Sequence, residues 1–115
     1  MLPRINRLKR QEDFKAVRLS GRKAKAGRLL VNFLPQQVGS VSRGAVVISS
    51  KAVSGSVERN RIRRLMAKLM RQQFDNWATR SAGDMVVVLL GSADVSSSEE
   101  LTADFNKCLE KLSLN

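Results

Sequence analysis

The stretch that most constrains the fold of this chain is Met85–Leu90, an uninterrupted run of apolar residues that follows Gly83-Asp84. A strand with one face in water alternates apolar and polar residues, whereas a continuous run of this length is typical of a strand covered on both faces. We therefore expect Met85–Leu90 to form the central strand of a sheet. A chain of 115 residues is long enough for one such core and too short for two, so residues 1–115 are expected to form a single domain.

Three amphipathic helices are predicted around this strand. Apolar residues at helical spacing indicate a first helix over 6–19 and a long helix over 58–74. A closing helix is predicted after a cap within 96–98, with acids in its first turn and apolar residues from Leu101 to Leu112. Ser56 is the expected N-cap of the long helix, because its hydroxyl can accept a hydrogen bond from an otherwise unpaired backbone N–H group. Each helix would then present one apolar face to the sheet.

Two further strands are predicted between the first and the long helix. The apolar runs 29–34 and 45–50 have strand length, and a stretch rich in Gly, Ser and Gln separates them. A hairpin between them is the simplest arrangement, and the basic stretch 22–28 is interpreted as a connector. The resulting order αββαβα indicates an α+β fold with a small mixed sheet.

The charge of the chain is large and unevenly distributed. Twenty-one Lys and Arg outnumber ten Asp and Glu, which gives a formal net charge of +11. Residues 1–71 hold 18 of the bases and 3 of the acids, whereas residues 72–115 hold 3 bases and 7 acids. Such an excess in a small domain indicates a polyanionic partner that is bound by the first two thirds of the chain.

Several classes of function are disfavoured by what the sequence lacks. Histidine and tyrosine are both absent, so the commonest general base is missing and self-sufficient acid–base catalysis is not expected. Cys108 is the single cysteine, so neither an intramolecular disulfide nor a cysteine metal site is expected. We find no signal peptide and no apolar run of about 18 residues, and therefore expect a soluble, cytoplasmic protein with no membrane partner.

The sharpest functional signal is the segment 59–64, Arg-Asn-Arg-Ile-Arg-Arg, at the start of the long helix. Like charges at i and i+4, such as Arg59 and Arg63, repel by about 0.2–0.5 kcal/mol per pair, and cations near a helix N-terminus oppose its dipole. A solvated helix face would carry counter-charges, yet only Glu58 lies nearby. A phosphate-bearing partner explains the cluster, because guanidinium groups bind phosphate oxygens bidentately.

A set of short motifs runs along the chain together with this helix. They are Asn6-Arg7-Leu8-Lys9, Asp13-Phe14, Gly21, Ser50-Lys51, Val57, the run from Arg59 to Leu65, and Gly83-Asp84. In the order and spacing of these motifs the chain resembles the protein subunits of bacterial ribonuclease P, and the resemblance covers essentially its whole length.

The resemblance implies a fold of the ribosomal protein S5 domain 2-like type. In that fold the Arg-Asn-Arg helix makes a left-handed βαβ crossover, contrary to the general right-handed rule. It also implies a role in the endoribonuclease that removes the 5′ leader from precursor tRNA, in which the RNA subunit is catalytic and binds most of the Mg²⁺. The partners would be ribonuclease P RNA and precursor tRNA, with no obligate protein partner and no catalytic residue on this chain.

The resemblance further assigns two RNA surfaces. The residues expected to face the catalytic RNA are Lys51, Arg59, Asn60, Arg61, Arg63, Arg64, Lys68 and Arg71. A cleft between the first helix and the sheet would receive the single-stranded leader, and its expected residues are Phe14, Arg18 and Asn32. Phe14 would stack on a base or, alternatively, pack in the core. Arg18 and Asn32 stand where the family usually has aromatic residues, so stacking would be weaker here.

Two other functions are open at this level. A ribosomal or other structural RNA-binding protein would use the same positive charge without a role in RNA processing. A DNA-binding protein would read the major groove with helix 58–74, although the predicted order of elements lacks a helix-turn-helix.

Overall fold

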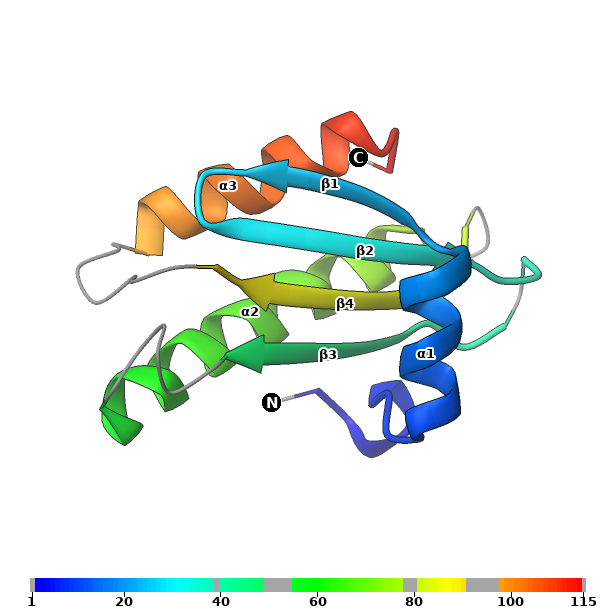
Figure 1. The fold of residues 1–115 in the computed structure, drawn as a ribbon, viewed down its shortest axis with the longest axis horizontal. Helices are drawn as coiled ribbons and strands as arrows, with labels where there is room; N and C mark the ends of the chain where they lie inside the picture. The colour runs from blue at the N-terminus through cyan, green and yellow to red at the C-terminus, as the bar shows by residue number, and fades with distance from the viewer. Residues whose placement is uncertain (1, 39, 49–54, 78–80, 91–97, 115) are drawn as a thin grey trace.

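The computed structural model describes residues 2–38, 40–48, 55–77, 81–90 and 98–114. These residues form three α-helices and one four-stranded sheet (Figure 1). In chain order the elements are η1 (Arg4–Asn6), α1 (Gln11–Ser20), β1 (Arg22–Ala26), β2 (Leu29–Pro35), β3 (Arg43–Ile48), α2 (Ser56–Trp77), β4 (Gly83–Leu89) and α3 (Ser98–Lys111). No helix in these ranges is long and apolar enough to cross a membrane.

The apolar run at 85–90 forms a central strand, as predicted. In the sheet order β1-β2-β4-β3, strand β4 pairs antiparallel with β2 and parallel with β3. Every residue of β4 except Val88 is buried, because α2 and α3 cover one face of the sheet and α1 covers part of the other. The mixed sheet and the α+β class are therefore confirmed.

The predicted hairpin between residues 29–34 and 45–50 is wrong. Strand β4 inserts between β2 and β3, and the hairpin partner of β2 is β1, within the stretch interpreted as a connector. Strand β1 escaped prediction because lysine is unusual in strands, although its Lys-Ala-Lys-Ala sequence has the two-residue period of a strand. Gly27, at a φ of 55°, makes the tight turn into β2.

Helices α1 and α2 begin at other residues than predicted. Helix α1 starts at Gln11, because the chain before it forms η1 and then an extended segment in which Arg7 bridges Gly44 of β3. At α2, the Arg59 N–H group donates to the Gly55 carbonyl, so Gly55 occupies the N-cap position and Ser56 is the first helical residue.

Helix α2 connects the parallel neighbours β3 and β4 across the face of the sheet opposite α1 (Figure 1). Viewed from the side that α2 covers, with both strands pointing up, β4 lies to the left of β3, so the crossover is left-handed. The apolar face of α2, which includes Ile62, Met66 and Met70, packs into the main core with β2, β4 and α3. The cationic side of α2 is thereby turned away from the sheet.

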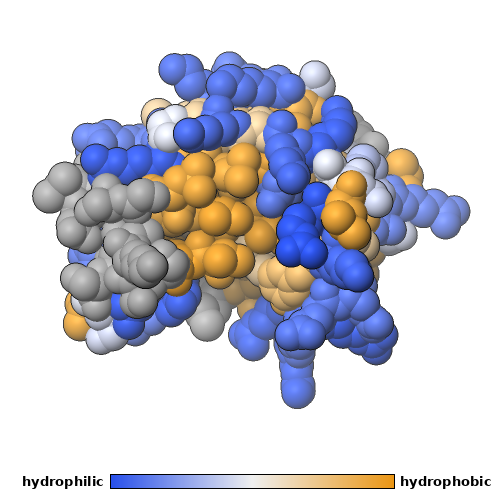
Figure 2. Space-filling view, viewed as in Figure 1, coloured by the Kyte–Doolittle hydropathy of each residue, from blue (hydrophilic) through white to orange (hydrophobic). Residues whose placement is uncertain are grey.

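Helix α1 covers only part of its face of the sheet. Figure 2 shows an apolar area over the strands beside α1, bordered by hydrophilic side chains. Val17 of α1 is fully buried in a small second core with Leu8 and Val86, whereas Val47 of β3 stays 42% exposed. The uncovered part of this face is where the candidate site lies.

Candidate nucleic-acid interface

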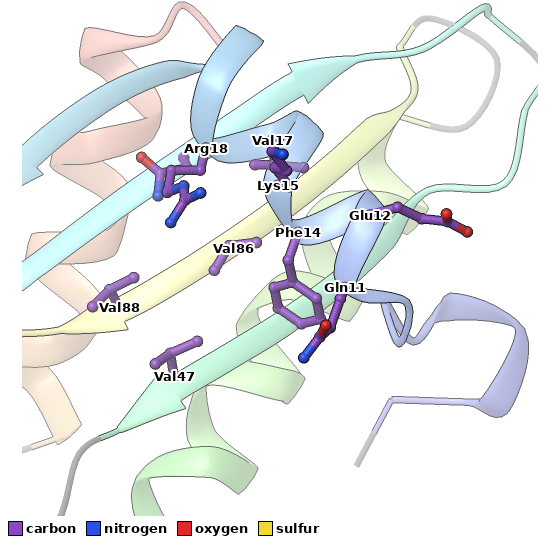
Figure 3. Close-up of a pocket in the computed structure, with 10 residues that line it drawn as sticks. Gln11, Glu12, Phe14, Lys15, Val17, Arg18, Val47, Val86 and Val88 are labelled. Carbon is purple, nitrogen blue, oxygen red and sulfur yellow. The ribbon is translucent and has the colours of Figure 1, made fainter.

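A groove of about 800 Å³ lies between α1 and the uncovered face of the sheet (Figure 3). Its floor is apolar and comes from β3 and β4, through Val47, Val86 and Val88. Its wall is α1, which contributes the aromatic ring of Phe14 and the positive charges of Lys15 and Arg18. An apolar floor beside cations suits a nucleobase with its phosphate.

The three residues predicted for a leader cleft all line this groove. Phe14 and Arg18 are one helical turn apart on α1, and Asn32 comes from β2. Phe14 is half-buried, since it packs against the second core and also lines the groove; its stacking on a base stays a prediction. The resemblance to the family predicted that these three residues share one cleft, and in the structure they line one groove.

Asn32 carries an unsatisfied polar atom on the groove side of the sheet. Its side chain is only 8% exposed, and its Oδ1 atom has no hydrogen-bond partner in the described part of the chain. Its neighbours across the strands are Val86 on β4 and Lys23 on β1, and directly opposed residues share one face of a sheet. An unpaired buried carbonyl oxygen is unfavourable, so a donor on a bound ligand would find it ready to accept.

Lys23 and Lys25 lie on the face of the sheet that holds the groove, and the sequence analysis did not name them. They lie opposite Asn32 and Leu30, and both are exposed, so they add positive charge to the same face of the sheet as the groove. The alternation of lysine and alanine over 23–26 was the available signal, because it places both lysines on one face and Ala24 and Ala26 in the core.

An ion-pair network holds the groove wall to the sheet. Arg43 of β3 donates to the two carboxylate oxygens of Asp84, at 3.0 Å from Nε and 2.7 Å from Nη2, and to Asp13 of α1 at 3.2 Å. The hydrogen bond to Asp84, together with the charges of both carboxylates, raises the pKa of Arg43 although burial opposes it. Asp13 precedes Phe14, so this network fixes the start of the wall.

Helix α2 carries the second predicted surface, on the other side of the sheet. Asn60, Arg64, Lys68 and Arg71 are all exposed and form a row at spacings of three and four, about 16 Å long at 1.5 Å per residue. Such a row can contact several phosphates of one folded RNA.

The other residues predicted for this surface are placed differently. Arg61 donates to Glu58, at 2.8 Å from its Nε, and to Ser98 Oγ of α3 at 3.2 Å. Arg59 and Arg63 are half-buried on the flank of α2. Lys51 lies outside the described residues.

The described ranges contain no group of three or more His, Cys, Asp or Glu that could hold a metal ion. Asp84, the carboxylate at the start of β4, is 2% exposed and is bound by Arg43. The acidic residues in the described part of the chain therefore do not form a site for a divalent cation.

Comparisons with known proteins agree with the fold and the motifs. A model of the ribonuclease P family matches residues 2–113. The ribonuclease P protein component of Streptomyces avermitilis is 35% identical over 97% of this chain and 95% of its own length, and that of Synechococcus elongatus is 46% identical over 61% of each chain.

Solved structures show the same fold at lower identity. A Staphylococcus aureus RNase P protein mutant with defective mRNA degradation activity superposes with a TM-score of 0.74 at 19% identity, covering 94% of this chain and 88% of that one. The RNase P protein from Thermotoga maritima gives 0.63 at 21% identity, covering 92% and 93%. The likeness thus extends over nearly the whole chain in sequence and in fold.

Proposed function

The chain belongs to the ribonuclease P protein family, and from this we propose that it is the protein subunit of ribonuclease P, the ribonucleoprotein that removes the 5′ leader of precursor tRNA. In this role it binds the catalytic RNA through the cationic side of α2 and the leader through the groove beside α1. The RNA subunit performs the hydrolysis, and the protein contributes binding and orientation.

The observation that carries this proposal is the groove. Phe14, Arg18 and Asn32 come from two elements and meet at one cavity, on the face of the sheet opposite α2. A single strand needs a path with an apolar or aromatic surface for its bases and cations for its phosphates. The groove offers both, and its position leaves α2 free to contact a second RNA at the same time.

The protein's contribution is electrostatic. Phosphates of two RNA molecules repel each other at the cleavage site, and cations on both sides of one small domain reduce that repulsion. Mg²⁺ supplies an activated water and charge neutralisation when it is bound, and we assign it mainly to the RNA subunit. No chemical step is assigned to this chain.

The test is reconstitution with the catalytic RNA. The protein alone is expected to cut nothing, and adding it to the RNA at low Mg²⁺ is expected to restore cleavage of precursor tRNA. If cleavage is restored at none of the salt concentrations tested, the proposal is refuted. Ribosomal RNA as the dominant species that copurifies at moderate salt would favour the alternative of a structural RNA-binding protein.

Phe14→Ala tests the groove separately. It is expected to weaken binding of precursor tRNA by roughly 5- to 150-fold, the range for loss of one stacked base, and to leave mature tRNA unaffected. Leu19→Ala is the matched control, because Leu19 lies on the same helix, is 67% exposed and does not line the groove. Equal losses on both substrates would remove the groove from the leader site.

A further inference from the structure

A second cavity lies at the edge of the sheet, and Arg63 is the one lining residue that it shares with the surfaces described above. It has a volume of about 220 Å³ and is bounded by the N-terminal segment, the outer edge of β3 and the flank of α2. Drug-sized ligands need roughly 300–1,000 Å³, so this slot has room for one planar ring system rather than for a larger molecule.

The bottom of the slot is apolar. Leu8 comes from the N-terminal segment, and Ala67 and Met70 come from successive turns of α2. All three side chains are at most 6% exposed, so they form a fixed surface. A free phosphate has no use for such a surface, whereas the face of a base does.

The rim of the slot is cationic. Arg7, Lys9 and Arg63 line it from two different elements, and no acidic residue is among its lining residues. Arg7 is oriented by a hydrogen bond from its Nε to the Leu2 carbonyl at 2.8 Å, and its two terminal nitrogens make no hydrogen bond within the described ranges. Three cations around an apolar opening fit a nucleotide whose base enters and whose phosphates stay outside.

The edge of β3 adds backbone polar groups to the slot. The Leu8 N–H group donates to the Gly44 carbonyl at 3.0 Å, and this is where the N-terminal segment meets β3. Peptide groups alternate in direction along a strand, so the N–H and C=O groups of Val46 face the same side as those of Gly44. Val46 therefore offers one donor and one acceptor to the edge of a base.

We propose that this slot binds a single unstacked nucleobase of the catalytic RNA, with the flanking phosphates on Arg7, Lys9 and Arg63. The inference rests on the proposed function, and it assigns a base-binding site outside the groove and outside the exposed row of α2 that runs from Asn60 to Arg71. Arg63 belongs to α2, the helix proposed to face the catalytic RNA, and the leader groove lies on the opposite face of the sheet, which is why the catalytic RNA is the source.

The experiment is chemical probing of base accessibility on the catalytic RNA, with and without protein. Ala67→Leu would fill the slot without changing charge, and Arg63→Gln would remove one rim cation. Each is expected to expose one base that the unaltered protein protects and to weaken RNA binding by roughly tenfold, as for loss of a stacked base. Gln72→Leu, on an exposed part of α2, and Lys107→Gln, on α3, are the matched controls and should leave that protection intact.

The outcomes separate the slot from the proposed function. If the unaltered protein protects no base of the catalytic RNA, the proposed function fails. If it protects bases and both slot variants protect them equally well, the slot inference fails and the function stands. If Ala67→Leu does not fold and shows no melting transition, Arg63→Gln carries the test, because Arg63 is only half-buried. Loss of affinity for an acidic peptide such as hexaglutamate, with RNA protection unchanged, would identify a peptide site and overturn the inference.

Discussion

The network of Asp13, Arg43 and Asp84 makes the sharpest quantitative prediction. Arg43→Met would keep the apolar stem of the side chain and remove its charged guanidinium group. Asp84 is 2% exposed, and Arg43 donates both short hydrogen bonds to its carboxylate. The variant therefore leaves a buried carboxylate whose one remaining partner among the described residues is Gln36, at 3.4 Å. Breaking a buried ion pair from one side destabilises a protein by about 3–5 kcal/mol.

We expect the lower end of that range. The Arg43 side chain is 34% exposed, so water reaches the space that it leaves and partly solvates Asp84. The bond to Asp13 adds little, because Asp13 is 26% exposed and exposed pairs contribute about 0–1 kcal/mol. The expected loss is therefore about 3 kcal/mol, or roughly 12 °C in melting temperature for a chain of this size.

Urea denaturation measures this loss as a lower midpoint at an unchanged slope. The double variant Arg43→Met with Asp84→Asn should recover about 1–2 kcal/mol of it, because no buried charge is then left unpaired. Arg10→Met is the control, since its pair with Glu12 is 77% and 76% exposed and should contribute almost nothing. A cost below about 0.5 kcal/mol for Arg43→Met would refute the reasoning.

Three further predictions follow from single residues. Burial raises the pKa of the Cys108 thiol, so at high pH the folded chain keeps a proton that the unfolded chain releases. The contribution of this thiol to the free energy of unfolding is complete below about pH 8.5 and is lost as the pH rises toward the folded pKa. The fall in urea midpoint above that pH should accordingly be shallower in Cys108→Ala. Gly27→Ala should lower the free energy of unfolding by at least about 1–2 kcal/mol, because the φ of residue 27 is 55° and a Cβ there would meet Asp104 Oδ2 at 2.2 Å. The double variant Gly27→Ala with Asp104→Ala should recover only the part of this loss that is due to the contact, and full recovery would contradict a backbone origin. Arg64→Ala, in the exposed row, should reduce the slope of log affinity against log salt by roughly 1 for the catalytic RNA, and an unchanged slope would place Arg64 away from phosphate.

Local patterns in the sequence predicted the three helices, three of the four strands and the character of their surfaces. The apolar run at 85–90 identified the central strand, because apolar residues at consecutive positions indicate that both faces of a strand are buried. The crowded cations at 59–64 identified a charged helix face, because repulsion along a helix is a local effect. The left-handed crossover and the grouping of Phe14, Arg18 and Asn32 were available only through resemblance to a family.

Pairing and contact between distant residues were decided by the tertiary structure. The position of β4 between β2 and β3, the placement of Lys23 beside Asn32, and the network that joins α1 to Asp84 all depend on strand register. The slot at the edge of β3 likewise exists only because the N-terminal segment and α2 converge there. Periodicity specifies which face of a segment is buried, whereas the choice of partner follows from the total burial and loop closure of the whole chain, which no local window contains.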